Sequence, residues 1–171
     1  MVDDYIINLK PEYIFMVAGL VGGIIANNTR QADFLYMNAL MILYTLESVK
    51  EHSPKTKILY TGSTCIYPKE NPQPINESRF MTGPLEETNK GYAVAKGMGV
   101  VACELYRKQY GINAIAAMPT NMYGPNDNYD PVNSHFIAAM IKKLVTAKKE
   151  GAVPVFWGSG KPRREALFTD D

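Results

Sequence analysis

The sequence K-I-L-Y-T-G-S-T-C-I-Y-P at residues 57–68 joins a short apolar segment to a turn that carries a hydroxyl and a thiol. Lys57–Thr61 has the composition of a strand, and Ser63 follows directly after its end. Further along, Y-A-V-A-K places Tyr92 and Lys96 four residues apart, so a helix brings both onto one face. The two segments together predict a hydroxyl at the end of a strand, next to a tyrosine and a lysine on the following helix.

These side chains suit the reduction of a carbonyl group. Hydride addition leaves negative charge on oxygen, and a tyrosine, whose ordinary pKa is about 10, protonates it more readily when a nearby cation lowers that pKa. Lys96 is expected to supply this charge, and Ser63 is expected to hydrogen-bond the oxygen. A tyrosine and a lysine at this spacing are usually an ordinary surface pair. The G-S-T-C-I-Y-P run upstream favours the catalytic interpretation instead.

Strand-like and helical patterns alternate along the chain. Alternation of this kind predicts an α/β fold, a Rossmann-like parallel sheet with helices on both faces, in which ligands bind beyond the carboxyl ends of the strands. Gly19, Ser63 and Asn121 all follow predicted strands and are expected to converge there. The predicted strands are residues 13–18, 57–61, 113–118 and 153–157. The predicted helices are residues 29–51, 85–110 and 133–149, and Asn133 or Ser134 is expected to cap the last of them. Residues 1–11 are expected to form a short lead-in, and residues 68–84 a proline-rich loop.

Composition limits the classes of function. The chain has 171 residues, of which 46% are hydrophobic and 20% charged, and a net charge of +1, so we expect a soluble globular protein without a nucleic-acid or membrane partner. No apolar run reaches the roughly 18–20 residues of a membrane span, and the acidic start M-V-D-D-Y is unlike a signal peptide. The two cysteines, Cys65 and Cys103, form no disulfide framework, which favours a cytoplasmic location, and no metal site is expected.

The glycine-rich turn at residues 19–23, G-L-V-G-G, invites interpretation as a dinucleotide-binding loop. A Rossmann fingerprint needs G-x-G-x-x-G at the start of a helix and an acidic residue about 20 positions later. The glycine spacing here differs, and no Asp or Glu occurs between Leu35 and Leu46. The turn is therefore not predicted to bind the cofactor's pyrophosphate.

Six collinear segments resemble the extended short-chain dehydrogenase/reductase superfamily and, within it, the GDP-L-fucose synthase family. They are V-G-G-I-I-A-N at 21–27, G-S-T-C-I-Y-P at 62–68, Y-A-V-A-K at 92–96, P-T-N-M-Y-G-P at 119–125, N-S-H at 133–135 and W-G-S-G at 157–160. The family begins with a strand and a glycine-rich turn that this chain lacks, and it continues beyond the last residue. The resemblance thus implies a piece truncated at both ends, without the first βαβ segment and most of the C-terminal substrate domain. Residues 1–150 would be a partial NAD(P)-binding domain with the catalytic helix, and 151–171 the start of the sugar-nucleotide-binding region.

The resemblance also implies a role for each matching residue. Ser63, Tyr92 and Lys96 would form the reductase triad, and Cys65 and His135 would move protons at the two carbons beside a sugar ketone. Two positions depart from the family, with Lys143 in place of the usual Arg and Gly19-Leu20 in place of Ala-Lys. The residues expected at the NADP(H) cofactor are Thr61, Gly62, Ser63, Thr64, Lys96, Pro119, Thr120, Asn121, Met122 and His135, and those expected at the GDP-sugar are Lys143, Trp157 and Arg164.

The activity implied is the NADPH-dependent 3,5-epimerisation and 4-reduction of GDP-4-keto-6-deoxy-D-mannose, by a homodimer and impaired in a truncated chain. Two alternatives stay open. One is another extended reductase, epimerase or dehydratase acting on a nucleotide sugar, although a simple 4-epimerase or dehydratase has no need of both Cys65 and His135. The other is an inactive fragment or binding module that keeps the catalytic residues.

Overall fold

The computed structural model describes residues 2–130, 134–161 and 163–171, and these form two compact units. The first unit comprises Met1–Val21 and Asn27–Pro119, and the second comprises Gly22–Ala26 and Thr120–Asp171. The division falls within the region that the sequence assigns to one cofactor domain, residues 1–150. That functional assignment stays a prediction, and each unit is described by itself below.

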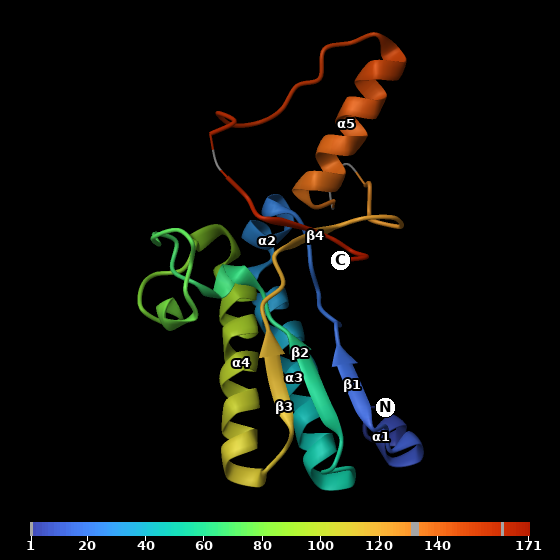
Figure 1. Ribbon diagram of the computed structural model, residues 1–171, viewed down its shortest axis with the longest axis vertical. Helices are drawn as coiled ribbons and strands as arrows, with labels where there is room; N and C mark the ends of the chain where they lie inside the picture. The colour runs from blue at the N-terminus through green and yellow to red at the C-terminus, as the bar shows by residue number, and fades with distance from the viewer. Residues whose placement is uncertain (1, 131–133, 162) are drawn as a thin grey trace. The chain divides into compact units, whose positions relative to one another are not determined.

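A parallel sheet forms the centre of the first unit (Figure 1). Its strands are β1 (Tyr13–Met16), β2 (Lys57–Thr61) and β3 (Ala114–Ala117), in the order β1-β2-β3. In the register of this sheet, Tyr60 pairs with Met16 on one side and with Ala116 on the other. All three strands therefore end at the same edge of the sheet, as a Rossmann-like fold requires.

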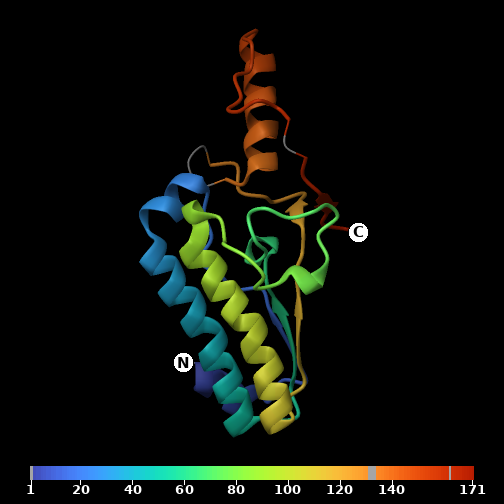
Figure 2. The ribbon, with the colours of Figure 1, turned by 90° about the vertical axis from the view of Figure 1, so that its left-hand side faces the viewer.

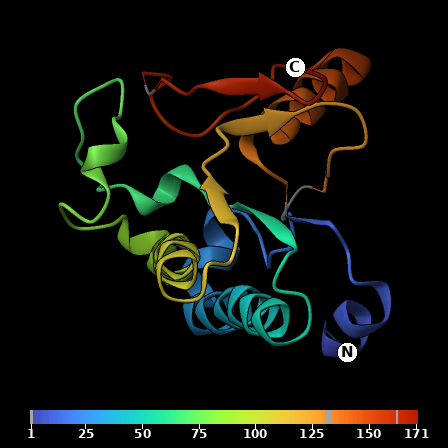
Figure 3. The ribbon, with the colours of Figure 1, turned by 60° about the horizontal axis from the view of Figure 1, so that its bottom comes forward.

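Two long helices, α3 (Gln31–His52) and α4 (Lys90–Tyr110), lie side by side on one face of this sheet (Figures 2 and 3). The core lies between them and the sheet and includes the fully buried Ile42, Leu46, Ile58 and Tyr60. A Cβ at Gly99 would lie only 2.4 Å from the Tyr60 ring, so this glycine lets α4 approach β2. The predicted α/β architecture with a parallel sheet is confirmed.

The opposite face of the sheet carries the alternate side chains of the strands, because successive residues of a strand point to opposite faces. Tyr13, Phe15 and Ile115 on this face are 52%, 67% and 51% exposed. Among the described residues, the two long helices thus share one face, whereas the sequence predicts helices on both. A short helix at the start of the chain, α1 (Val2–Leu9), packs on α3 through the buried Ile6, where the sequence predicts only a lead-in.

Two helix starts differ from the prediction. The helix predicted to begin at residue 29 is α3, which begins at Gln31, and residue 29 ends a separate short helix, α2 (Ile24–Thr29), that the sequence does not predict. Helix α4 begins at Lys90, five residues later than predicted, because a 3-10 turn, Glu87–Asn89, precedes it. Its end agrees with prediction, since Gly111 adopts the left-handed conformation that commonly follows a helix.

The second unit contains α5 (Phe136–Glu150) and a two-stranded parallel sheet of β4 (Asn121–Tyr123) and β5 (Ala166–Phe168). The predicted strand at 153–157 is wrong: these residues form no strand, and Val153, Val155 and Trp157 are exposed. Pro154 interrupts the run and has no backbone N–H to donate to a neighbouring strand. His135 occupies the N-cap position of α5, so the predicted cap Ser134 is wrong, and the other predicted cap, Asn133, lies outside the described residues.

Across the described part of the chain, no helix combines the length and apolar character that crossing a membrane requires.

Candidate functional site

The carboxyl end of β2 places a serine and a cysteine in one tight turn. Ser63 has an extended backbone and caps the 3-10 turn Thr64–Ile66, where its Oγ accepts a hydrogen bond from the Cys65 N–H at 3.4 Å. Gly62 is buried, and a Cβ there would lie 2.9 Å from the Met118 sulfur. Because Gly62 has no side chain, the turn follows β2 directly, next to Met118. The Ser63 hydroxyl and the Cys65 thiol are thereby held close together.

Helix α4 brings Lys96 to the same end of β2. Lys96 is only 4% exposed, and its Nζ donates a hydrogen bond to the Thr61 carbonyl oxygen at 2.8 Å. The same ammonium group lies 5.0 Å from the centroid of the Tyr60 ring and 5.8 Å from that of Tyr92. A buried lysine needs such partners because desolvation disfavours its charge. The strand end thus fixes the ammonium group beside Tyr92.

Tyr92 lies one helical turn before Lys96, and its surroundings raise its pKa. The pKa of Tyr92 is raised to about 12: burial is the largest cause and the nearby Cys65 adds to it, while a hydrogen bond with Ser63 acts in the opposite direction. Burial also lowers the pKa of Lys96. The sequence predicts a lowered tyrosine pKa, and that prediction is wrong, because burial of the phenol and the nearby Cys65 outweigh the hydrogen bond with Ser63.

The thiol of Cys65 completes this cluster. Burial raises its pKa, while the hydrogen bond with Ser63 and the charge of Lys96 act in the opposite direction. The structure therefore brings four of the predicted site residues, Ser63, Cys65, Tyr92 and Lys96, into one interacting group. At neutral pH the group holds a protonated phenol and a protonated thiol next to an ammonium charge.

Asn38 on α3 also supports this cluster, although no motif in the sequence singles it out. It is 3% exposed, and its side chain accepts a hydrogen bond from the Leu20 N–H at 3.0 Å and donates one to the Leu20 carbonyl oxygen at 3.0 Å. A Cβ at Gly19 would lie 3.2 Å from Asn38 Oδ1 and 3.6 Å from Lys96 Nζ. Asn38 thus holds the turn after β1 beside the lysine. The signal in the sequence is a polar residue on the otherwise apolar face Phe34–Ile42.

Thr61, Gly62 and Thr64, also predicted at the cofactor, belong to the first unit together with Pro119, its last residue, and the remaining predicted residues belong to the second unit. Thr120 Oγ1 and Asn121 Nδ2 both donate to the Glu165 carbonyl oxygen, at 2.9 and 2.8 Å. Met122 and His135 are exposed. The Asn121 amide, predicted to face the cofactor, therefore bonds the backbone of its own unit.

Lys143 and Trp157, predicted to bind substrate, do meet in the second unit. Lys143 Nζ donates to the Val155 carbonyl oxygen at 3.1 Å and lies 5.3 Å from the centroid of the Trp157 ring. Trp157 itself is 82% exposed. Arg164 is also exposed, and its guanidinium donates to the carbonyl oxygen of Arg163. The pair of Lys143 and Trp157 thus presents an ammonium charge and an indole ring on the surface of this unit. Within the described residues, no cluster of three His, Cys, Asp or Glu side chains suits a metal ion.

The chain is similar to a known protein family over its whole length. The family model described as the NAD dependent epimerase/dehydratase family matches residues 1–171. The chain is 48% identical to GDP-L-fucose synthase 1 of Arabidopsis thaliana and 47% identical to the GDP-L-fucose synthase of Sinorhizobium fredii, covering 99% of this chain and 53% and 54% of those proteins. A solved GDP-L-fucose synthetase from Naegleria fowleri bound to NADP is 28% identical with a TM-score of 0.83, over 97% of this chain and 54% of that one. The chain thus spans about half the length of these relatives.

Proposed function

Because the chain belongs to the NAD dependent epimerase/dehydratase family, we propose that it carries the chemical centre of a GDP-L-fucose synthase. The reaction would be 3,5-epimerisation and 4-reduction of GDP-4-keto-6-deoxy-D-mannose with NADPH. The observation that carries the proposal is the cluster of Ser63, Cys65, Tyr92 and Lys96 at the end of β2. The names of the relatives, which are 47–48% identical, support the choice of substrate.

In the reduction, Tyr92 would donate a proton to the C4 oxygen. A phenol with a pKa of about 12 is fully protonated at neutral pH, as a proton donor must be. The charge of Lys96 would stabilise the phenolate left after the transfer, and Ser63 would hydrogen-bond the sugar oxygen. Burial of this group strengthens both effects, because electrostatic interactions are stronger in a medium of low polarity.

In the epimerisation, Cys65 and His135 would move protons at C3 and C5. The ketone at C4 acidifies both positions, and inversion needs one group to remove a proton and another to return one from the opposite face. The thiol of Cys65 lies in the same interacting group as Tyr92 and Lys96, which supports its action on the sugar that Tyr92 reduces. His135 is exposed at the start of α5, where an imidazole is open to a ligand.

The residues present fit a nicotinamide cofactor, which when bound supplies the hydride. The ammonium group of Lys96 has three donors, of which the Thr61 carbonyl oxygen takes one, and the Tyr92 hydroxyl lies nearby, so both suit a ribose hydroxyl. Gly19 leaves space beside the lysine. The backbone after β2 and the segment after β3 would border the nicotinamide half of NADP(H): Thr61, Gly62, Ser63, Thr64, Pro119, Thr120, Asn121, Met122 and His135.

Lys143, Trp157 and Arg164 would bind the GDP part of the substrate. The ammonium group of Lys143 beside the Trp157 ring combines a charge for phosphate with an aromatic surface for a base. Because the Lys143 ammonium group is a point charge and cannot form the two parallel hydrogen bonds of a guanidinium, it would bind a diphosphate more weakly than an arginine.

A homodimer in the cytoplasm would be the working form. The outer surface of α3 and α4 exposes Leu43, Tyr44 and Leu105, at 37%, 59% and 52%, and a hollow there is lined by Leu40, Leu43, Tyr44, Glu47 and Tyr106. An apolar surface of this kind favours pairing with a second copy. Both cysteines are free thiols, which fits a reducing compartment.

Solvent deuterium exchange tests the proposal. Incubated in D₂O with NADPH and the GDP-4-keto-6-deoxy sugar, the chain is expected to incorporate deuterium at C3 and C5 and to reduce C4. Tyr92→Phe should keep the exchange and lose the reduction, whereas Cys65→Ser should lose the exchange. Fluorescence titration with NADPH gives an independent reading of cofactor binding. A parent chain that neither exchanges nor binds NADPH would identify an inert piece and reject the proposal.

A further inference from the structure

The N-terminus of α4 has no cap from its own sequence. The N-cap residue Asn89 makes no side-chain hydrogen bond to the helix, and among the described residues its Oδ1 is buried without a partner. The first N–H groups of a helix need acceptors from outside the helix. One of them, the N–H of Gly91, donates instead to Oε1 of Gln31 at 3.1 Å. The cap of this helix therefore comes from a residue 60 positions earlier in the chain.

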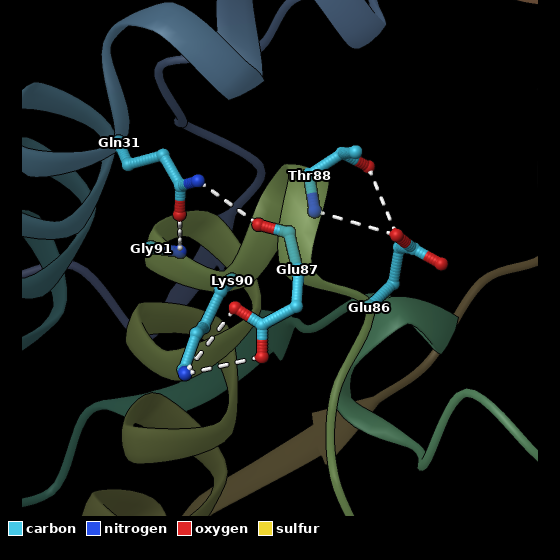
Figure 4. Close-up of polar contacts among 6 residues, drawn as sticks. All are labelled: Gln31, Glu86, Glu87, Thr88, Lys90 and Gly91. Carbon is cyan, nitrogen blue, oxygen red and sulfur yellow. Dashed lines mark hydrogen bonds and ion pairs between the residues drawn. The ribbon is translucent and has the colours of Figure 1, made fainter.

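The Gln31 amide makes a second bond to the same turn. Its Nε2 donates to the Glu87 carbonyl oxygen at 2.9 Å, so that one side chain bridges the 3-10 turn and the first turn of α4 (Figure 4). Other side chains of this turn also have partners: Glu86 accepts from Thr88 and pairs with Lys69, and Lys90 pairs with Glu87. Among the residues drawn in Figure 4, the Gln31 amide alone connects this turn to α3 by hydrogen bonds.

Gly91 brings the two backbones into direct contact at this point. A Cβ on Gly91 would lie 2.2 Å from the Gln31 carbonyl oxygen and 2.9 Å from its carbonyl carbon. Backbone atoms cannot move aside as a flexible side chain can, so no other residue fits at position 91 with the helices in place. The start of α3 and the start of α4 are thus fixed against each other.

Tyr92 follows directly after this contact. Its ring packs edge-on against Phe34, with 6.4 Å between the centroids, and Phe34 is 1% exposed. Gln31 and Phe34 are three residues apart on α3 and so share a face. Helix α3 therefore holds the backbone before Tyr92 through Gln31 and the ring of Tyr92 through Phe34.

We propose that Gln31 is a positioning residue for Tyr92: its amide caps α4 from α3 and so fixes where the phenol meets the ketone oxygen. This inference rests on the proposed function, in which Tyr92 donates the proton. The Gln31 amide bonds Glu87 and Gly91, and within the described part of the chain it makes no hydrogen bond to Ser63 or Cys65. Its removal should therefore affect the reduction and spare the exchange catalysed through Cys65.

Three variants separate the hydrogen bonds from the bulk of the side chain. Gln31→Met keeps the length and loses both bonds, and we expect the Gly91 amide to exchange with solvent about 5- to 10-fold faster, and kcat for reduction to fall by a similar factor, as loss of a helix cap predicts. Deuterium incorporation at C3 and C5 and KM for the sugar should stay at the parent values. Gln31→Glu keeps an acceptor for the Gly91 N–H at a helix N-terminus but loses the donor to the Glu87 carbonyl oxygen, so it should restore both quantities only in part. Arg30→Ala, which removes an exposed ion pair one residue away, serves as the control and should change neither.

The outcomes distinguish this inference from the proposed function. Amide exchange of Gly91, followed by NMR, needs no catalysis and therefore reads the cap even in an inactive chain. An unchanged exchange rate in Gln31→Met would show that the amide does not cap α4. Faster exchange with unchanged reduction would show that the cap stabilises the helix without positioning Tyr92. Loss of reduction and of deuterium incorporation together in Gln31→Met would also overturn the inference, since it would mean that the whole site had been disturbed.

Discussion

The end of β2 with α4, and the segment from Thr120 to Asp171, hold their functional side chains in opposite ways. In the first region Lys96 is 4% exposed and bonded to the strand end, and Ser63, Cys65 and Tyr92 interact with one another. In the second, Trp157 is 82% exposed and Lys143 bonds only the backbone of its own unit. A buried network keeps one geometry because unpaired polar groups are costly there, whereas exposed side chains lose rotamer freedom only when a ligand binds. The chemical groups are thus preorganised, and the binding groups are not.

Removing the phenol should give the largest effect. Tyr92→Phe is expected to lower the rate of reduction by about 10²- to 10⁴-fold, the usual contribution of a general acid, with little change in stability because the ring and its contact with Phe34 remain. Tyr106→Phe is a matched control on the same helix, since its hydroxyl contacts only the surface residue Glu47. The rate is measured by NADPH oxidation with the keto sugar. Equal losses in both variants would contradict the preorganised role of Tyr92.

The pH dependence of this step follows from the same pKa. Tyr92 with a pKa raised to about 12 donates a proton only while it is protonated, so its contribution is complete at neutral pH and is lost as the pH rises toward 12. We therefore expect no fall in the tyrosine-dependent rate between about pH 7 and 9. A rate that falls across that range, and does so less in a variant of Lys96, would assign the titration to the lysine, whose pKa burial lowers.

Stability should differ between the two regions as well. Leu46→Ala, on the fully buried face of α3, is expected to lower the free energy of unfolding by about 2–5 kcal/mol, because it removes buried surface and leaves a cavity. Trp157→Ala, at an exposed position, should change it by less than about 0.5 kcal/mol. Urea denaturation followed by far-ultraviolet circular dichroism measures both. A large loss in Trp157→Ala would show that the surface pair with Lys143 is structural.

The rate at which Cys65 is alkylated tests how far its thiol is buried. Burial raises the pKa of its thiol, so less thiolate is present at neutral pH than for a free cysteine, and alkylation by iodoacetamide at pH 7.5 should be slower than that of free cysteine and should rise as the pH is raised. The Cys103→Ala variant removes the second, buried thiol from the measurement. Ser63→Ala should slow the reaction further, because the Ser63 hydrogen bond lowers the pKa of Cys65. A thiol that reacts as fast as free cysteine at pH 7.5 would contradict the buried environment.

Sequence predicts the first region far better than the second, for a physical reason. The strand Lys57–Thr61 and the helix end at Gly111 are local events, set by alternating burial and by one glycine, and both agree with the structure. The strand predicted at 153–157 fails because an apolar run forms a strand only where a partner strand lies alongside. The parallel pair β4 and β5 joins Asn121–Tyr123 to Ala166–Phe168, and no local pattern encodes a pairing over that separation.

The roles of side chains, too, can be predicted from the sequence only where their contacts are local. The spacing of Tyr92 and Lys96 is visible in the sequence because a helix makes it local. The contacts of Asn38 with Leu20 and of Gln31 with Gly91 bridge 18 and 60 positions, so they appear only when the chain is folded. The pKa of Tyr92 also depends on burial by the whole fold, and a neighbouring lysine in the sequence therefore gives the wrong sign.

The smallest effect is expected for GDP binding at Lys143, in the second of the two regions. Lys143→Ala should weaken binding of GDP by about fivefold, since a half-buried charge at the surface contributes little against solvent, and stability should stay unchanged. Lys143→Arg should bind GDP at least as well as the parent, because a guanidinium forms two parallel bonds to a phosphate. Lys149→Ala, an exposed lysine at the end of α5, controls for the change in net charge. The single tryptophan, Trp157, lies 5.3 Å from the Lys143 ammonium, so quenching of its fluorescence by GDP measures binding at that place. Equal weakening in Lys143→Ala and Lys149→Ala would mean that GDP responds to overall charge, and that the pair of Lys143 and Trp157 forms no binding site.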